Sequence, residues 1–200
     1  FTWNRIKQGW NIQIPLVAQW RNEGRLRVET LTESGRWFKQ NFPLTPATAV
    51  TAMLDQNDNP VGSIWYNSRF YRTNMMWTHN EFRFRDIHLF DQRIESDYLK
   101  KAGTSTQCIY MTMPLVDGYM WSSNSAWAGL RLVEIQSDGS SRQIKTGRPE
   151  IEEKGSELII KCHPAEGEFT IRCTEQALYI AFDSDKQWAL ELTTATGKQL

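Results

Sequence analysis

The stretch LIIKCHPAEGEFTIRC, residues 158–173, decides the fold class. It contains two short apolar runs, 158–162 and 169–173, separated by a segment that holds Pro and Gly. Apolar and β-branched runs on either side of turn residues are typical of an antiparallel hairpin. The same pattern recurs through much of the chain, so the sequence favours an all-β protein.

The register of this hairpin determines how far apart two of the cysteines lie. The simplest pairing sets Cys162 opposite Phe169 and Cys173 opposite Leu158, so the two thiols lie at opposite corners of the hairpin. That separation is too large for a disulfide, whose Cβ atoms lie about 4 Å apart. With Cys108 the chain has three cysteines, no CxxC pair and no His at zinc-finger spacing. We expect free, buried thiols, no bound metal and no cofactor.

Alternation of apolar and polar residues predicts further strands. The longest run begins at Trp10 and ends at Trp20, with apolar residues at the even positions, and it is predicted to form a hairpin with residues 26–30. The other predicted strands cover residues 45–54, 61–66, 81–90, 107–113, 130–136, 178–182 and 188–193. One short helix is expected after Asp91, with Ile94 and Tyr98 on one side.

Many strands, one helix and no regular alternation of the two indicate an antiparallel β-sandwich, jelly-roll-like, with one short helix. We expect a single β-sandwich domain over residues 1–200, with a weak seam at residues 137–155, where Ser, Gly, Lys and Glu crowd together. The residues after the seam fit either a long hairpin of the same sandwich or a separate small sheet.

The charge balance limits the partners. Lys and Arg number 23, as do Asp and Glu, so the chain lacks the basic surplus that neutralises phosphates, and we expect no nucleic-acid partner. No apolar run approaches the roughly 18 residues that a membrane span needs, and we expect no such span. The sequence begins at Phe1 without a basic-then-apolar leader, which fits a removed signal segment or a piece of a longer protein.

Tryptophan is the strongest anomaly of the composition, because the chain has nine. Flat aromatic rings suit the C–H faces of sugars, and they also form the centres of protein interfaces. Residues 64–77 and 118–127 concentrate such rings among Asn, Ser and Arg. We predict a ligand-binding surface, with arginines available for an acidic sugar, formed by Trp65, Arg69, Tyr71, Arg72, Trp77, Tyr119, Trp121 and Trp127.

A second cluster has the residue types of acid–base chemistry: His79, Glu81, Asp86 and His88. On a regular strand the first two lie on one face and the last two on the other, so the four cannot converge. The apolar positions change parity between Phe84 and Ile87, which predicts a β-bulge near Arg85 and Asp86, and a bulge can re-aim side chains beside an active site. A structural carboxylate–imidazole pair fits this cluster, and the alternatives are acid–base catalysis or metal binding.

The Trp-bearing alternating run near the start, the loops with Asn and Trp, and the pairing of residues 157–161 with 169–172 together resemble the β-sandwich accessory domains of secreted bacterial carbohydrate-active enzymes. The resemblance implies a secreted or periplasmic protein that binds a carbohydrate polymer or oligosaccharide, or that packs against an adjoining catalytic domain.

Three hypotheses remain. The first is a non-catalytic carbohydrate-binding or accessory module of a bacterial glycan-degrading system, with the ligand stacked on Trp and Tyr side chains. The second is a glycoside hydrolase or polysaccharide lyase that uses the His, Glu and Asp cluster. The third is a structural or interaction module whose aromatic residues meet another domain or a second copy of the chain.

Overall fold

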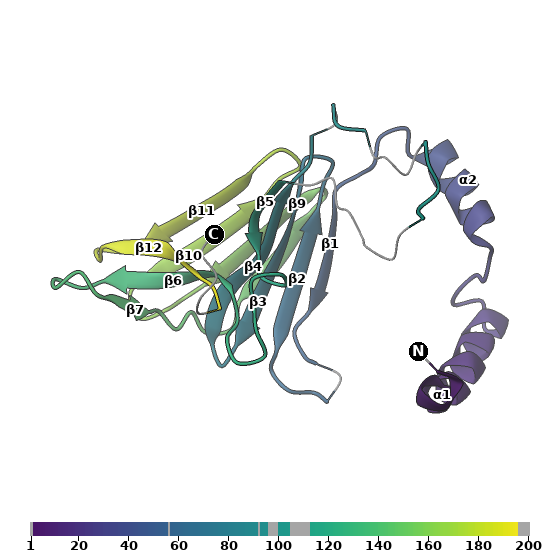
Figure 1. Ribbon diagram of the computed structural model, residues 1–200, viewed down its shortest axis with the longest axis horizontal. Helices are drawn as coiled ribbons and strands as arrows, with labels where there is room; N and C mark the ends of the chain where they lie inside the picture. Colours follow the sequence, from purple (N-terminus) through teal and green to yellow (C-terminus); the bar gives the residue numbers. More distant parts are fainter. Residues whose placement is uncertain (1, 56, 92, 96–99, 105–112, 196–200) are drawn as a thin grey trace. The chain divides into compact units, whose positions relative to one another are not determined.

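The chain divides into two compact units, Phe1–Leu44 and Thr45–Leu200 (Figure 1). The structure, a computed structural model, describes residues 2–55, 57–91, 93–95, 100–104 and 113–195. The first unit contains the helices α1 (Trp3–Asn22) and α2 (Leu31–Asn41), and the second contains the twelve described strands. None of the described helices is long and apolar enough to cross a membrane.

Helix α1 corrects the strand predicted between Trp10 and Trp20. Apolar side chains occur at Trp10, Ile14 and Val17, which are four and three residues apart, as well as at the alternate positions that suggested a strand. The helical period of 3.6 and the strand period of two therefore both fit this run, and periodicity alone does not separate them. The helix also contains Pro15, and no residue in it is buried.

Helix α2 begins with a capping box, and the strand predicted for residues 26–30 does not form. The Glu33 N–H donates to Thr30 Oγ1 at 3.3 Å, and the Thr30 N–H donates to the Glu33 carboxylate at 2.7 Å. The two bonds satisfy backbone donors that a helix start leaves without partners. The T-x-x-E spacing was a readable sign of this helix.

The short helix predicted after Asp91 falls largely on residues 92 and 96–99, which lie outside the described residues, and residues 93 and 94 form a turn. The Ile94 N–H donates to the Asp91 carbonyl oxygen at 3.0 Å. Tyr98 lies outside the described residues.

The second unit consists of two antiparallel sheets with eight and four strands. The larger sheet has the order β1-β2-β3-β4-β6-β12, with β5 paired to β4 and β7 to β6, and the smaller has the order β11-β10-β9-β8. The strands are β1 (Thr48–Ala52), β2 (Gly62–Asn67), β3 (Tyr71–Thr78), β4 (Glu81–Leu89), β5 (Met113–Asp117), β6 (Gly129–Ile135), β7 (Ser141–Gln143), β8 (Glu150–Lys154), β9 (Glu157–Cys162), β10 (Glu168–Cys173), β11 (Leu178–Asp183) and β12 (Trp188–Thr193). Most neighbours are consecutive in sequence, so the sheets are mainly meanders, and this order differs from the two Greek keys of a jelly roll.

Strands β9 and β10 confirm the predicted hairpin and its register. Cys162 lies opposite Phe169 and Cys173 opposite Leu158, and both thiols are free and buried. Cys108 and most of the strand predicted for residues 107–113 lie outside the described residues. Strand β3 has no counterpart among the predicted strands, and neither do β7 and β8, which lie within residues 137–155.

Among the described residues, one hydrophobic cluster joins the two sheets. Phe82 of β4 contacts Phe169 of β10, with ring centroids 5.2 Å apart, and Ile160 and Ile171 of the smaller sheet are fully buried beside them. Side chains alternate between the two faces along each strand. The residues between the core positions of β2, β3 and β4 therefore lie on the outer face of the larger sheet.

Candidate functional site

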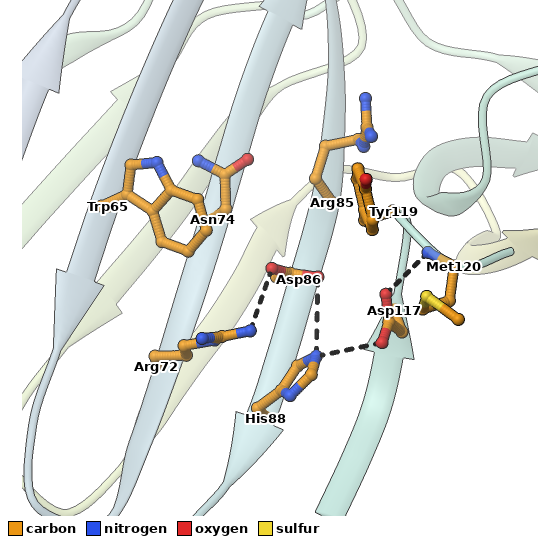
Figure 2. Close-up of a pocket in the computed structure, with 9 residues that line it drawn as sticks. All are labelled: Trp65, Arg72, Asn74, Arg85, Asp86, His88, Asp117, Tyr119 and Met120. Atoms are coloured by element: carbon orange, nitrogen blue, oxygen red, sulfur yellow. Dashed lines mark hydrogen bonds and ion pairs between the residues drawn. The ribbon is translucent and has the colours of Figure 1, made fainter. Parts of the chain in front are cut away.

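The outer face of the larger sheet carries a pocket of about 340 Å³ (Figure 2). It is lined by Trp65, Arg72, Asn74, Arg85, Asp86, His88, Asp117, Tyr119 and Met120. These residues come from β2, β3, β4, β5 and the segment that follows β5. The volume is at the small end of the range of sites for small molecules, about 300–1,000 Å³.

The register of four strands explains why these side chains meet. Trp65 of β2 lies opposite Asn74 of β3, which in turn lies opposite Asp86 of β4. On its other side Asp86 lies opposite Asp117 of β5. Directly opposed residues have Cβ atoms about 4.5–5.5 Å apart. Strand pairing therefore assembles a row of one indole, one amide and two carboxylates across the sheet.

A β-bulge in β4 directs Asp86 and His88 to this row. The register of β4 against β3 shifts by one residue at Arg85. Phe84 before the bulge and Ile87 after it are both in the core. On a regular strand Asp86 and His88 would share the core-facing side with Phe84. The bulge predicted near Arg85 and Asp86 is confirmed, and it turns these two polar side chains to the outer face.

The neighbour of β4 changes at the same place, because β4 pairs with β6 before the bulge and with β5 after it. The Gly118 N–H donates to the Arg85 carbonyl oxygen at 2.6 Å, and a Cβ at Gly118 would clash with that oxygen. This close backbone approach holds Asp117 and Tyr119 against the bulge.

The charged groups of the pocket lie within ion-pair distance of one another. Arg72 Nη2 is 3.6 Å from Asp86 Oδ2, and His88 Nε2 is 3.6 Å from Asp86 Oδ1. His88 Nε2 is also 3.6 Å from Asp117 Oδ2. Burial raises the pKa of the Asp86 carboxyl, although the nearby His88 and Arg72 act to lower it. The pocket thus holds two carboxylates, an imidazole and two guanidinium groups in a partly dry environment.

Two aromatic side chains form the apolar part of the pocket. The guanidinium carbon of Arg72 lies 6.0 Å from the ring centroid of Trp65, and Tyr119 is 81% exposed. Trp127, which is 48% exposed, lies beside the pocket, because Arg85 is positioned over its ring at 5.2 Å.

The predicted ligand-binding residues separate into three groups. Trp65, Arg72 and Tyr119 line the pocket, and Trp127 lies beside it. Tyr71 and Trp77 are corrected as ligand contacts, because each is 3% exposed and belongs to the core. Trp121 packs partly buried against the same core, and Arg69 pairs with Glu175 at 2.8 Å and does not line the pocket.

The predicted acid–base residues do not all converge. Asp86 and His88 line the pocket, whereas His79 is exposed in the turn between β3 and β4. Glu81 begins β4 and forms an isolated bridge with Lys145. Glu81 and His88 are seven residues apart on one strand, which corresponds to about 23 Å. His79 and Glu81 therefore cannot act with the other two residues in one site.

Asn74, Arg85, Asp117 and Met120 line the pocket but are absent from the predicted site. The alternation of Arg72 and Asn74 with buried Tyr71 and Thr73 was a readable strand signal that could have found Asn74. For Asp117 the sequence indicates a turn at the following Gly118, but no local pattern says that this turn packs against β4.

No protein-family model, curated protein or solved structure matches this chain.

Proposed function

We propose that the second unit is a β-sandwich module that binds a carbohydrate in the pocket on the outer face of its larger sheet. The observation that carries this proposal is the position of two aromatic rings, Trp65 and Tyr119, around a row of hydrogen-bonding groups that includes Asn74 and Asp86. A sugar presents apolar C–H faces to such rings and hydroxyl groups to such polar side chains.

The charges of the pocket favour a neutral sugar. Arg72 and Arg85 balance Asp86 and Asp117, so the formal charge is zero when His88 is neutral. Arg72 already lies beside the Asp86 carboxylate. An acidic sugar would have to compete with that carboxylate for the guanidinium, whereas a neutral hydroxyl can bond to both groups.

We further propose that this module serves a secreted or periplasmic glycan-degrading system of bacteria, next to a catalytic domain. The hairpin of residues 157–162 and 168–173 supports the resemblance on which this setting rests. The Trp-bearing run between Trp10 and Trp20 no longer supports it, because that run is helical.

The binding proposal is tested with a glycan array of neutral and uronic-acid polymers, followed by calorimetry on each polymer that binds. Trp65→Ala and Tyr119→Ala should each weaken binding about tenfold, the equivalent of about 1.4 kcal/mol. Trp37→Ala is the matched control, since Trp37 is also half-exposed but belongs to α2. Absence of binding to every polymer, or an equal loss in the Trp37 variant, would contradict the proposal.

Glycan cleavage is a second candidate function, favoured by one observation: His88 Nε2 lies 3.6 Å from an oxygen of each of two carboxylates. An imidazole held between carboxylates is suited to general acid–base catalysis in a hydrolase or lyase. On this hypothesis His88→Ala lowers the turnover of a bound glycan about 100-fold. His79→Ala, in the exposed turn, leaves it unchanged, and equal turnover in both variants would exclude His88 as the base.

A further inference from the structure

Three potential ligand atoms converge at one end of the pocket (Figure 2). His88 Nε2 lies 3.6 Å from Asp86 Oδ1 and 3.6 Å from Asp117 Oδ2, and the three atoms are all within 4.8 Å of one another. Separations of this size exceed the roughly 2.7–3.2 Å of a good hydrogen bond. They are close to the edge of a coordination tetrahedron, because two ligands about 2.1 Å from one ion lie about 3.4 Å apart.

The other oxygen of each carboxylate has a partner of its own. Arg72 Nη2 lies 3.6 Å from Asp86 Oδ2, and the Met120 N–H donates to Asp117 Oδ1 at 2.9 Å. Each carboxylate therefore turns its remaining oxygen toward His88. Outer partners of this kind orient the ligands of protein metal sites.

Asp86 supplies a second, independent observation. This residue is 8% exposed, and its Oδ1 atom is buried and accepts no hydrogen bond within the part of the chain that the structure describes. A buried carboxylate oxygen without a hydrogen bond carries an uncompensated desolvation cost. The atom that bears this cost is the one that faces His88 Nε2.

The register of β4 and β5 sets two carboxylates opposite each other. Asp86 lies directly opposite Asp117 on the neighbouring strand, and like charges at opposed positions destabilise a sheet. Arg72 and Arg85 offset part of this negative charge, but neither lies between the two carboxylate oxygens that face His88. A divalent cation between the two carboxylates would neutralise both and convert the repulsion into attraction.

We propose that Asp86, His88 and Asp117 bind one divalent first-row transition-metal ion of the class of Zn²⁺ or Mn²⁺. One imidazole and two carboxylates suit such ions, whereas Ca²⁺ takes six to eight oxygen ligands. Three protein ligands leave at least one coordination position for water or for an oxygen of a bound molecule. The site goes beyond the proposed carbohydrate binding and does not depend on it.

The competing arrangement is a protonated His88 that is shared by the two carboxylates without a metal. The two arrangements predict opposite effects for Asp117→Asn. With a metal site, the metal-free variant is as stable as the native protein or more stable, because the repulsion between residues 86 and 117 is removed. With a protonated His88, the same variant is less stable, because an ion pair is lost.

The experiment uses the full chain after treatment with a chelator and dialysis. The melting temperature and calorimetric binding are measured with Zn²⁺, Mn²⁺ and Ca²⁺ in turn. We expect one Zn²⁺ or Mn²⁺ per chain, with a rise in melting temperature that follows from binding to the folded state alone. Asp117→Asn and His88→Gln should each lower the metal affinity at least tenfold, because loss of even an outer-shell partner typically costs 10–100-fold.

His163 provides the matched control, because its ring nitrogens lie 3.7 Å from Glu150 and 3.8 Å from Glu168 on an exposed surface. His163→Gln should leave the affinity unchanged. The proposal is overturned by no rise in melting temperature at millimolar metal, by equal losses in the His88 and His163 variants, or by a destabilised metal-free Asp117→Asn protein that shows no response to metal. Glycan binding measured in the presence of the chelator separates failure of this site from failure of the proposed function.

Discussion

Asp86 lies directly opposite Asp117 on the paired strands β4 and β5, and His88 Nε2 is 3.6 Å from an oxygen of each. Two irregularities of the larger sheet produce this arrangement: the bulge at Arg85 and a register shift against β5 between Ile87 and His88. Without the bulge, Asp86 and His88 would point into the core beside phenylalanine rings. The backbone of β4 therefore determines the chemistry of the pocket as much as its side chains do.

Gly129 should be essential for the backbone beside the bulge. Its φ is +139°, and a Cβ at this position would clash with the carbonyl oxygen of Phe84. We expect Gly129→Ala to lower the free energy of unfolding by about 2–3 kcal/mol, measured by urea denaturation. The control is Gly139→Ala, because Gly139 also has a positive φ, +81°, but meets no atom within 4 Å. This variant should lose only about 1 kcal/mol, and equal losses would show that the contact with Phe84 carries no cost.

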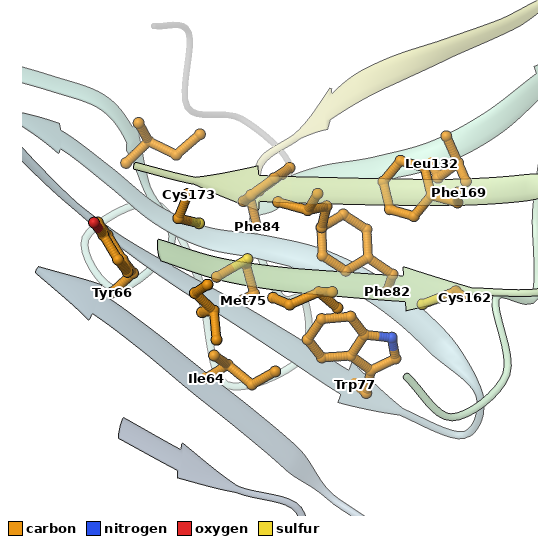
Figure 3. Packing of buried hydrophobic residues seen from close by; sticks show 14 of the residues in the cluster. Ile64, Tyr66, Met75, Trp77, Phe82, Phe84, Leu132, Cys162, Phe169 and Cys173 are labelled. Atoms are coloured by element: carbon orange, nitrogen blue, oxygen red, sulfur yellow. The ribbon is translucent and has the colours of Figure 1, made fainter. Parts of the chain in front are cut away.

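Phe82 should contribute strongly to the packing of the two sheets. Its ring centroid lies 5.2 Å from that of Phe169 on the smaller sheet and 5.0 Å from that of Trp77 (Figure 3). We expect Phe82→Ala to lower the free energy of unfolding by about 3–5 kcal/mol. Phe82→Leu, which keeps most of the volume, should cost about 1.5 kcal/mol or less and stay folded. Val50→Ala on the exposed edge strand β1 should change stability by less than about 0.5 kcal/mol, and a similar loss there would contradict a special role for Phe82.

The sequence predicts those parts of this fold that depend on neighbouring residues. The β9–β10 hairpin and the bulge near Arg85 follow from the alternation of side chains, which is a local property. The same rule fails between Trp10 and Trp20, because apolar residues there satisfy both the strand and the helix period.

Only part of the candidate site could be predicted, for a related reason. Four of the pocket residues lie on strands that are consecutive in sequence, and their side chains are of types common in binding and catalytic sites: Trp65, Arg72, Asp86 and His88. Asp117 reaches the pocket only because β5 pairs with β4. The segment between these two strands includes residues that the structure does not describe. Likewise, Trp65 lines the pocket whereas Trp77 belongs to the core. The two residues are of the same type, and they differ in the face of the sheet on which each side chain lies.

Two arginines that were both predicted to bind the ligand, Arg69 and Arg72, should differ in their contribution to glycan affinity. Arg72 lines the pocket beside Trp65, whereas Arg69 pairs with Glu175 at 2.8 Å. We expect Arg72→Gln to weaken glycan binding about tenfold, as the loss of one charge-assisted hydrogen bond worth about 1.4 kcal/mol would do. Arg69→Gln should leave the affinity unchanged. Calorimetry on a polymer identified by the array measures both, and a loss confined to the Arg69 variant would move the binding surface away from the pocket.

The two buried thiols should make the fold sensitive to alkaline pH. Burial raises the pKa of Cys162 to about 11 and that of Cys173 to about 12, against an ordinary value of 9.0. Because the folded state holds these protons more tightly than the unfolded chain, the stability linked to them is fully present below pH 9 and is lost as the pH rises toward the folded pKa values. One pKa unit corresponds to about 1.4 kcal/mol, so Cys162 alone should account for about 3 kcal/mol of this loss.

Urea denaturation at a series of pH values from neutral to strongly alkaline measures the effect. Lysines and tyrosines also titrate in this range, and burial raises the pKa of Tyr66 to about 12. The informative quantity is therefore the difference in pH dependence between the native protein and Cys162→Ala, not the absolute stability of either. The variant should lose less stability on going from pH 9 toward pH 11, because it has no thiol to ionise at that position. Parallel pH profiles would contradict this prediction, because they would mean that the Cys162 thiol ionises as easily in the folded core as in the unfolded chain.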